Sequence, residues 1–277
     1  MTSVDEKASV EKASAEKLDS PLWWRIAETM RMGWREFLAD NPPGIIVGTV
    51  LPRMLLQALF FTLLGSVIAG ADQRRYAFVG GLAMALATTN VLYVAQVPVA
   101  DKEFATFWRV RSGRLHPVVV FLARSLPYPV VMFVILVVCV VVLGPVTGLA
   151  SLAVNLLPLL GVYLLISFTS TAAGLAAGAF AVGRRVEVLA SNVMGYLIML
   201  CSGVFMPPGR VAVIDVVGTV LPARHGVAAI HAALAGQPWL HLVVAEAVTG
   251  VGWLAVMVVI VLVQIRRAAR SGHDDFE

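Results

Sequence analysis

Long apolar stretches separated by short polar gaps fill most of this chain, and they decide what it can fold into. A helix that spans a membrane needs about 20 mainly apolar residues. The sequence offers such stretches at about residues 44–69, 77–99, 126–147, 152–178, 188–206 and 242–265. A soluble domain of 277 residues that is 59% hydrophobic could not bury so much apolar surface. We therefore predict an all-α integral membrane protein with six transmembrane helices, because lipid offers backbone groups no partners outside a helix.

Basic residues gather in alternate gaps between these stretches. One set of gaps, taken with the two ends of the chain, holds Lys7, Lys12, Lys17, Arg25, Arg31, Arg35, Lys102, Arg109, Arg111, Arg114, Arg184, Arg185, Arg266, Arg267 and Arg270. The other set holds Arg74, Arg75, Arg210 and Arg224. Because Lys and Arg concentrate on the cytoplasmic side, both termini are predicted to be cytoplasmic. The same bias explains the net charge of +4 without a nucleic-acid partner. A composition rich in Ala, Val and Arg but poor in Lys is typical of a GC-rich bacterium, which favours a bacterial plasma membrane.

The N-terminal part divides into a polar tail and an amphipathic segment. Residues 1–20 repeat Glu-Lys-Ala-Ser-type units and hold no apolar core of a signal peptide, so a disordered cytoplasmic tail is expected. Over residues 21–41, large apolar side chains recur at helical spacing, which predicts a helix lying in the membrane interface. It serves as an anchor, as a brace for a cytosolic partner, or as both. Its candidate bracing residues are Trp23, Trp24, Arg31, Trp34 and Arg35.

The second cytoplasmic gap, residues 101–114, combines charges and aromatic rings in a run compatible with a helix that ends at Gly113. Aromatic side chains on a water-exposed segment are typical of a protein interface. The alternative is that these rings pack against the amphipathic helix or dip into the headgroups. The candidate interface residues are Glu103, Phe104, Thr106, Phe107, Trp108 and Arg109.

Between the fifth and sixth stretches, residues 207–240 are too apolar for an ordinary loop and too rich in Pro and Gly for a span. We predict short re-entrant helices that dip into the outer leaflet, with a loop folded over the helix ends as the alternative. The candidate residues around this segment are Ser202, Gly203, Pro207, Pro222 and His225. The stretch from 42 to 265 thus forms one transmembrane domain, followed by a cytoplasmic tail at 266–277.

No motif in the sequence supplies energy or chemistry. It has no phosphate-binding loop of the G-x-x-x-x-G-K-[ST] type and no metal-ligand cluster, so neither a cofactor nor a metal is expected in this chain. Cys139 and Cys201 lie in separate apolar stretches and are read as unpaired thiols. Two alternatives stay open. One is a membrane-embedded enzyme that uses Ser202 with a histidine, and the other is a gradient-driven carrier that uses Arg53 and Glu246.

Polar side chains within the spans either join helices by hydrogen bonds or line a passage for an amphiphile. For the second role the candidate residues are Asn90, Gln96, Asn192, Tyr196 and Met199.

Three local patterns in this order resemble the membrane subunit of type-2 ABC exporters. They are the amphipathic entry helix, the acidic residue and threonine at Glu103 and Thr106, and Ser202-Gly203-Val204-Phe205 followed later by Pro222-Ala223-Arg224-His225. The sequence departs from the family pattern at Ala105, where glycine is usual, and at His231, where arginine is common.

The resemblance implies a permease subunit that pairs with a second permease, identical or paralogous. A cytosolic ABC ATPase would bind ATP and Mg²⁺ beneath the pair. Residues 101–113 would be the coupling helix, and the exported substrate would be an amphiphilic or hydrophobic drug, antibiotic or lipid-linked molecule. A polysaccharide is the alternative substrate.

Overall fold

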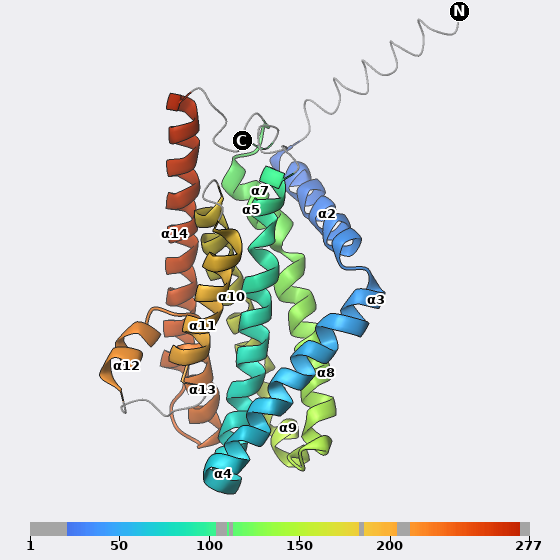
Figure 1. Cartoon of the computed structure of the whole chain (residues 1–277), viewed down its shortest axis with the longest axis vertical. Coiled ribbons are helices and arrows are strands. Elements are labelled where there is room, and N and C mark those ends of the chain that lie inside the picture. The colour runs from blue at the N-terminus through green and yellow to red at the C-terminus, as the bar shows by residue number, and fades with distance from the viewer. Residues whose placement is uncertain (1–20, 104–109, 111–112, 183–185, 204–210, 272–277) are drawn as a thin grey trace, which may run out of the picture.

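A computed structural model describes residues 21–103, 110, 113–182, 186–203 and 211–271, and in these residues every regular element is a helix. The helices form an elongated bundle (Figure 1). The start of α2 and the end of α14 lie at the same end of the bundle as α5 and α7 (Figure 1). The predicted tail at residues 1–20 and the end of the predicted C-terminal tail at 272–277 lie outside the described residues.

The entry segment folds as predicted at the level of helix bounds. Helix α2 runs over Leu22–Asp40, close to the predicted 21–41, and ends where the Pro42–Pro43 pair prevents its continuation. The short α3 (Pro43–Ile45) and a π-helical turn η1 (Ile46–Val50) lead into the bundle. The location of α2 in the membrane interface stays a prediction.

Helix α4 (Leu51–Val94) is a hairpin of two antiparallel arms. The chain reverses at Gly70, whose φ of +79° favours glycine, and the second arm continues into α5 (Gln96–Glu103). The arms touch closely, because a Cβ atom on Gly65 would lie 2.5 Å from the Cβ atom of Ala77. The hairpin supplies two candidate spans, Pro43–Ile68 and Asp72–Asp101.

The third candidate span extends over Pro117–Val146 and is built from α7 (Pro117–Ser125) and α8 (Pro127–Val146). It begins earlier than the predicted 126–147. Pro127 stands at the first position of α8, where a proline costs no hydrogen bond, so it joins two helices in one span. The fourth span consists of α9 (Ala150–Leu156), a 3₁₀ turn η2 (Leu157–Leu159) and α10 (Leu160–Ala181).

The C-terminal part contains α11 (Glu187–Cys201), α12 (Ala212–Gly218), α13 (Arg224–Leu234) and α14 (Leu240–Ser271). The predicted fifth span corresponds to α11, which has 15 residues and is shorter than the other spans. Within the described residues, five helical segments are long and apolar enough to cross a membrane. The count of six stays a prediction, as does the re-entrant nature of α12 and α13. Helix α14 passes the predicted end of the last span and continues to Ser271.

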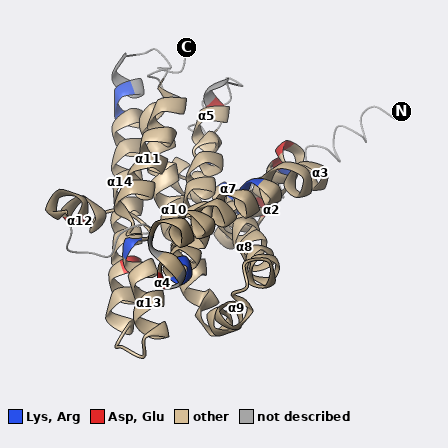
Figure 2. Cartoon of the chain, turned by 60° about the horizontal axis from the view of Figure 1, so that its bottom comes forward, with Lys and Arg blue, Asp and Glu red and all other residues tan. Residues whose placement is uncertain are grey.

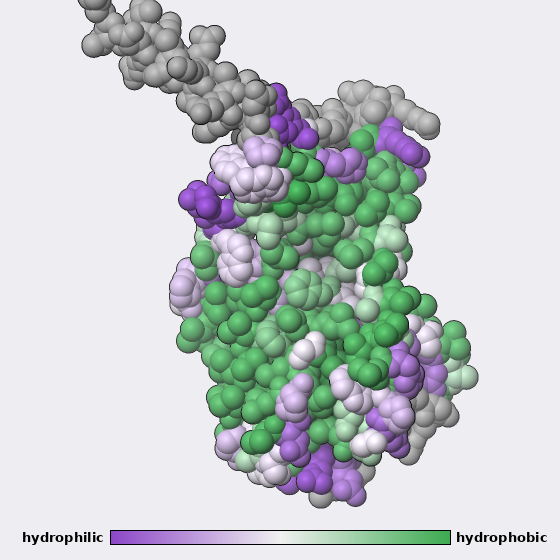
Figure 3. Space-filling view, turned by 180° about the vertical axis from the view of Figure 1, so that it is seen from behind, coloured by the Kyte–Doolittle hydropathy of each residue, from purple (hydrophilic) through white to green (hydrophobic). Residues whose placement is uncertain are grey.

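Burial separates central from peripheral spans. In an apolar stretch of 18 residues, 89% of the residues are buried in the span Asp72–Asp101, against 17% in Pro43–Ile68 and 17% in Leu240–Arg267. The peripheral spans expose large apolar side chains, for example Leu56, Phe60, Leu63 and Val67 on one face of α4. Hydrophobic side chains form a broad belt with polar residues toward its two ends (Figure 3), and charged residues are sparse on the bundle (Figure 2). Such a surface suits contact with lipid.

Small residues on α10 allow a close helix contact in the core. A Cβ atom on Gly178 would lie 2.4 Å from the carbonyl oxygen of Ala95, and one on Gly174 would lie 2.9 Å from the Cα atom of Val91. Small residues four apart are typical of close helix packing in membranes, because lipid provides no hydrophobic force between helices.

Gly178→Leu is therefore expected to separate α10 from the end of α4 and to destabilise the fold by about 1–3 kcal/mol, as overpacking does. Gly161→Ala, on the same helix with no neighbouring atom within 4 Å, should be near neutral. Thermal unfolding of both variants in detergent, followed by size-exclusion chromatography, measures the difference. Equal midpoints for the two variants would contradict this packing role.

Candidate functional site

A buried ion cluster fastens three helices together at one end of the bundle, which we call the triad end. Arg124 on α7 donates from Nε to Glu36 on α2 at 2.8 Å. Its Nη1 atom donates to both carboxylate oxygens of Asp101 on α5, at 2.9 and 2.7 Å. The side chains of Arg124 and Asp101 are 11% and 6% exposed, so the ion pair between them is largely buried.

The backbone of α2 approaches α7 closely at this cluster. A Cβ atom on Gly33 would lie 2.6 Å from the Cα atom of Arg124, so only glycine allows this contact. One turn later, the buried Phe37 packs edge-on against Tyr128 at the start of α8, with ring centroids 4.9 Å apart. Helix α2 is thus seated on α7 and α8 by apolar packing as well as by ions.

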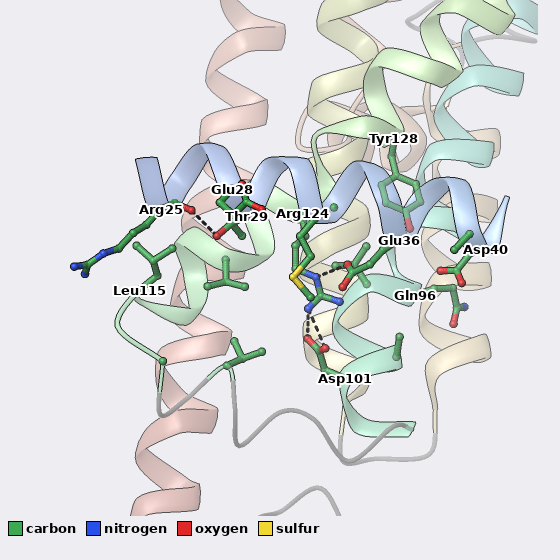
Figure 4. Close-up of a pocket in the computed structure, with 18 of the residues that line it drawn as sticks. Arg25, Glu28, Thr29, Glu36, Asp40, Gln96, Asp101, Leu115, Arg124 and Tyr128 are labelled. Atoms are coloured by element: carbon green, nitrogen blue, oxygen red, sulfur yellow. Dashed lines mark hydrogen bonds and ion pairs between the residues drawn. The ribbon is translucent and has the colours of Figure 1, made fainter. Parts of the chain in front are cut away.

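A cavity of about 770 Å³ opens between α2, α5 and α7 at the triad end (Figure 4). Its walls include the apolar side chains of Trp24, Met32, Val97, Leu115 and Val120. The charged residues that line it are Arg25, Glu28, Glu36, Asp40, Asp101, Arg114 and Arg124. A cavity of this size matches a drug-sized ligand.

A second polar network holds α13 at the opposite end, which we call the α13 end. Glu246 on α14 is fully buried, and its Oε1 accepts from the Thr169 hydroxyl at 2.6 Å and from the Ala223 backbone N–H at 2.8 Å. Its Oε2 accepts from the Gly226 N–H at 2.9 Å. The carboxylate therefore caps the N-terminus of α13 from another helix, where it satisfies N–H groups that lack partners within the helix.

Arg224, the first residue of α13, binds α11 and α12 rather than α14. Its guanidinium donates to the Cys201 carbonyl oxygen at the end of α11, at 3.1 Å, and forms an ion pair with Asp215 on α12. Tyr76 on α4 donates to the Gly203 carbonyl oxygen at 2.9 Å and stacks on His231 with ring centroids 3.9 Å apart. These contacts join α4, α11, α12 and α13.

The structure describes only part of the predicted coupling site. Glu103 is the last residue of α5, while Phe104, Thr106, Phe107, Trp108 and Arg109 lie outside the described residues. On α2, Trp34 contacts Phe37 edge-on, at a centroid distance of 6.4 Å. The remaining predicted bracing residues, Trp23, Trp24, Arg31 and Arg35, are exposed.

The predicted pathway residues, all of them described, fall in separate places. Asn90 is fully buried and donates to the Ser167 hydroxyl at 2.6 Å, which donates in turn to the Pro129 carbonyl oxygen at 2.8 Å. It therefore joins α4, α10 and α8 as a helix cross-link. Gln96 lines the triad-end cavity. Asn192, Tyr196 and Met199 share a partly exposed face of α11, on which Tyr196 is 65% exposed.

The predicted re-entrant residues lie around Arg224, except Pro207, which is outside the described residues. Gly203 adopts a φ of +77°, and the buried Pro222 precedes the α13 cap at Ala223. The buried Ser202 hydroxyl has no hydrogen-bond partner among the described residues, and His225 Nε2 contacts the Thr219 carbonyl oxygen at 3.0 Å. Among the described residues, no base contacts the Ser202 hydroxyl, and His225 is engaged with Thr219 instead. No group of three possible metal ligands occurs in the described part of the chain.

Sequence reasoning missed the roles of Glu36, Arg124 and Arg224. A charged residue at the edge of an apolar stretch is itself a signal in the sequence, because such an ion is costly unless it is paired. The hydropathy pattern indicates that each ion needs a partner, but it does not indicate which residue provides it. Glu246 was singled out as a possible carrier group, whereas its three hydrogen bonds make it a helix cap.

Comparison with protein families gives a match to the ABC-2 type transporter model over residues 28–235. The chain belongs to the ABC-2 type transporter family. This ABC-2 permease is therefore a multi-pass membrane subunit of an ABC transporter, as the resemblance predicted, and membership implies an ABC ATPase as partner. The match begins within α2 and ends just after α13, so it includes the triad and Arg224, whereas Glu246 lies beyond it. A search of curated proteins finds no match to the chain.

Proposed function

We propose that this ABC-2 permease exports an amphiphilic or hydrophobic molecule, such as a drug, an antibiotic or a lipid-linked compound, from the cytoplasm or the inner leaflet. Two permease copies, or this chain with a paralogue, would pair in a bacterial plasma membrane. ATP and Mg²⁺ would bind to a cytosolic ATPase on the triad side, where both termini would lie. The family match carries the proposal, and the triad supports it by linking the entry helix to the helix that leads into the coupling segment.

The triad offers a route for mechanical coupling. Asp101 lies two residues before Glu103, at which α5 ends and the predicted coupling residues begin. Because Asp101 binds Arg124, a displacement of the coupling segment by the ATPase would move α7 and the span that follows it. Through Glu36 the same arginine would also move α2. Rigid elements joined by a buried ion cluster can carry such a motion.

The substrate route would lie beside α11, at the face where two permeases would pair. The exposed face of α11 carries Leu189, Val193, Tyr196 and Leu200, which suits lipid, a second copy or an amphiphile. Few aromatic residues occur there, which favours an amphiphile over a polysaccharide. The sparse charge of the spans, with Glu246 engaged as a cap, argues against a gradient-driven carrier.

Coupling through residues 101–109 is tested by combining Glu103→Arg with Phe107→Ala. We expect the permease to lose copurification of its ATPase, stimulation of ATP hydrolysis and transport, because an aromatic anchor at such an interface is worth about 2 kcal/mol or more. The measurement is a pull-down from native membranes in mild detergent, with an ATPase assay on the eluate. Intact stimulation and transport by the double variant would show that coupling occurs elsewhere.

A further inference from the structure

One end of the triad-end cavity is lined by the carboxylates of Glu36 and Asp40 and by the Tyr128 hydroxyl, which has no hydrogen-bond partner among the described residues. We propose that it is a binding site for an organic cation with an apolar body, taken up from the inner-leaflet side. This inference rests on the proposed export function and narrows its substrate class. Asp40, Glu36, Gln96 and Tyr128 border this end of the cavity (Figure 4).

Among the described side chains, carboxylates predominate at this end. Arg124 is shared between Glu36 and Asp101, and Asp101 has a further partner. Asp40 is exposed at the mouth of the cavity, and among the described residues no cation lies within ion-pair distance of it. It is the last residue of α2, whose final turn contains no basic residue. A helix C-terminus carries partial negative charge, so helix and side chain both favour a cation here.

The remaining cations that line the cavity do not neutralise this end. Arg25 lies 15 residues before Asp40 on the same helix, a separation of about 22 Å at the rise of an α-helix. Its side chain points away from the labelled carboxylates (Figure 4). Arg25 and Arg114 also each have a partner already.

Tyr128 provides an independent sign of a missing ligand. Its side chain is 6% exposed and packs on Phe37, yet its phenol oxygen points into the cavity beside Glu36 (Figure 4). No hydrogen bond to this hydroxyl occurs among the described residues. The ring is buried while the hydroxyl opens into the cavity, where a ligand can supply its hydrogen bond.

The cavity walls define the rest of the ligand. Met32 and Val97 offer apolar surface and Tyr128 offers an aromatic ring at the end of the cavity that holds the carboxylates. Aromatic rings and carboxylates together favour organic cations over hydrated inorganic ones, because the ligand gains both burial and charge. An anion of the same shape would face Asp40 and Glu36 and be repelled.

The test compares two ions of matched shape and opposite charge, tetraphenylphosphonium and tetraphenylborate. Equilibrium dialysis measures their binding to the full-length permease in phosphatidylcholine nanodiscs, with empty nanodiscs subtracted. We expect saturable binding of the phosphonium with an affinity at least tenfold above that of the borate, which corresponds to about 1.4 kcal/mol. Equal affinities for the two ions would overturn the proposal.

Variants locate the site. Asp40→Asn is expected to weaken phosphonium binding about tenfold, a loss of about 1.4 kcal/mol. Asp72→Asn, an equal charge change on an exposed residue at the opposite end of the bundle, should leave it unchanged. Ala100→Trp places a large ring in the cavity without altering charge and should abolish saturable binding. Wild-type affinity in both Asp40→Asn and Ala100→Trp would show that the ion binds elsewhere.

Two further measurements distinguish a substrate site from a lipid site and separate this proposal from the export function. Loss of phosphonium binding in nanodiscs that contain phosphatidylethanolamine would mean that a lipid ammonium group occupies the cavity, which would overturn the proposed occupant. Copurification of the ATPase is scored independently. If the ATPase copurifies but the phosphonium does not bind, the proposed cation site is wrong and the export function stands. If the phosphonium binds but no ATPase copurifies, the cation site stands and the export function is refuted.

Discussion

Glu246→Ala is expected to lower the free energy of unfolding of this permease by about 3 to 5 kcal/mol. The carboxylate is fully buried and accepts hydrogen bonds from the backbone N–H groups of Ala223 and Gly226 and from Thr169. Each donor left unsatisfied in an apolar interior costs about 1–3 kcal/mol. Without this cap, α13 should detach from α14, so the loss would also be visible as increased proteolysis near residues 219–226.

Two milder variants should lose less stability than Glu246→Ala. Glu246→Gln keeps an acceptor oxygen for part of the cap and should lose less stability than alanine, while Thr169→Val removes one donor and should cost about 1 kcal/mol. The measurement is unfolding by sodium dodecyl sulfate in mixed micelles, followed by circular dichroism. Asp72→Ala is the matched control, since it removes an exposed carboxylate. A Glu246→Ala variant as stable as Asp72→Ala would refute the capping role.

Arg124→Leu is expected to destabilise the triad end by about 3–5 kcal/mol and to abolish ATP-driven transport. Removing one partner of a buried ion pair leaves the other charge without compensation, which is the costly case. Asp101 is the buried carboxylate that would lose this bidentate partner, since its side chain is 6% exposed, whereas Glu36 at 34% can be hydrated. Helix α2 should then separate from α7, and a nitroxide pair on α2 and α7 would report a longer and broader distance distribution.

The chain offers an internal control for this prediction. Arg31 and Glu28 form an exposed pair on the same α2 helix, with side chains 68% and 44% exposed, so Arg31→Leu should have little effect on stability. The double variant Arg124→Leu with Asp101→Leu should regain much of the stability, because an apolar pair of similar volume can replace a buried ion pair. Transport should stay impaired if the triad transmits motion. Similar unfolding curves for Arg124→Leu and Arg31→Leu would contradict the prediction.

The two polar networks differ in whether the match to the family model covers all of their residues. The match over residues 28–235 includes every member of the triad, whereas Glu246 lies outside it. The triad thus belongs to the part of the chain shared with the ABC-2 family model. The cap on α13 combines matched residues, Ala223 and Gly226, with an acid from the last helix. Damage at the triad should therefore affect coupling, and damage at Glu246 should first affect folding.

The sequence by itself determined the membrane class, five of the helical spans and the presence of a helix before the first span, because hydropathy and helical periodicity depend on neighbours within a few turns. It misplaced the start of the third span, where Pro127 joins two helices rather than interrupting one. Only the tertiary structure decided which partner each buried charged side chain binds. Arg124 and Glu36 are 88 positions apart, and Glu246 and Ala223 are 23 apart. Such pairs are chosen by how the helices pack, and packing depends on close contacts such as Gly33 on Arg124 that no local pattern records.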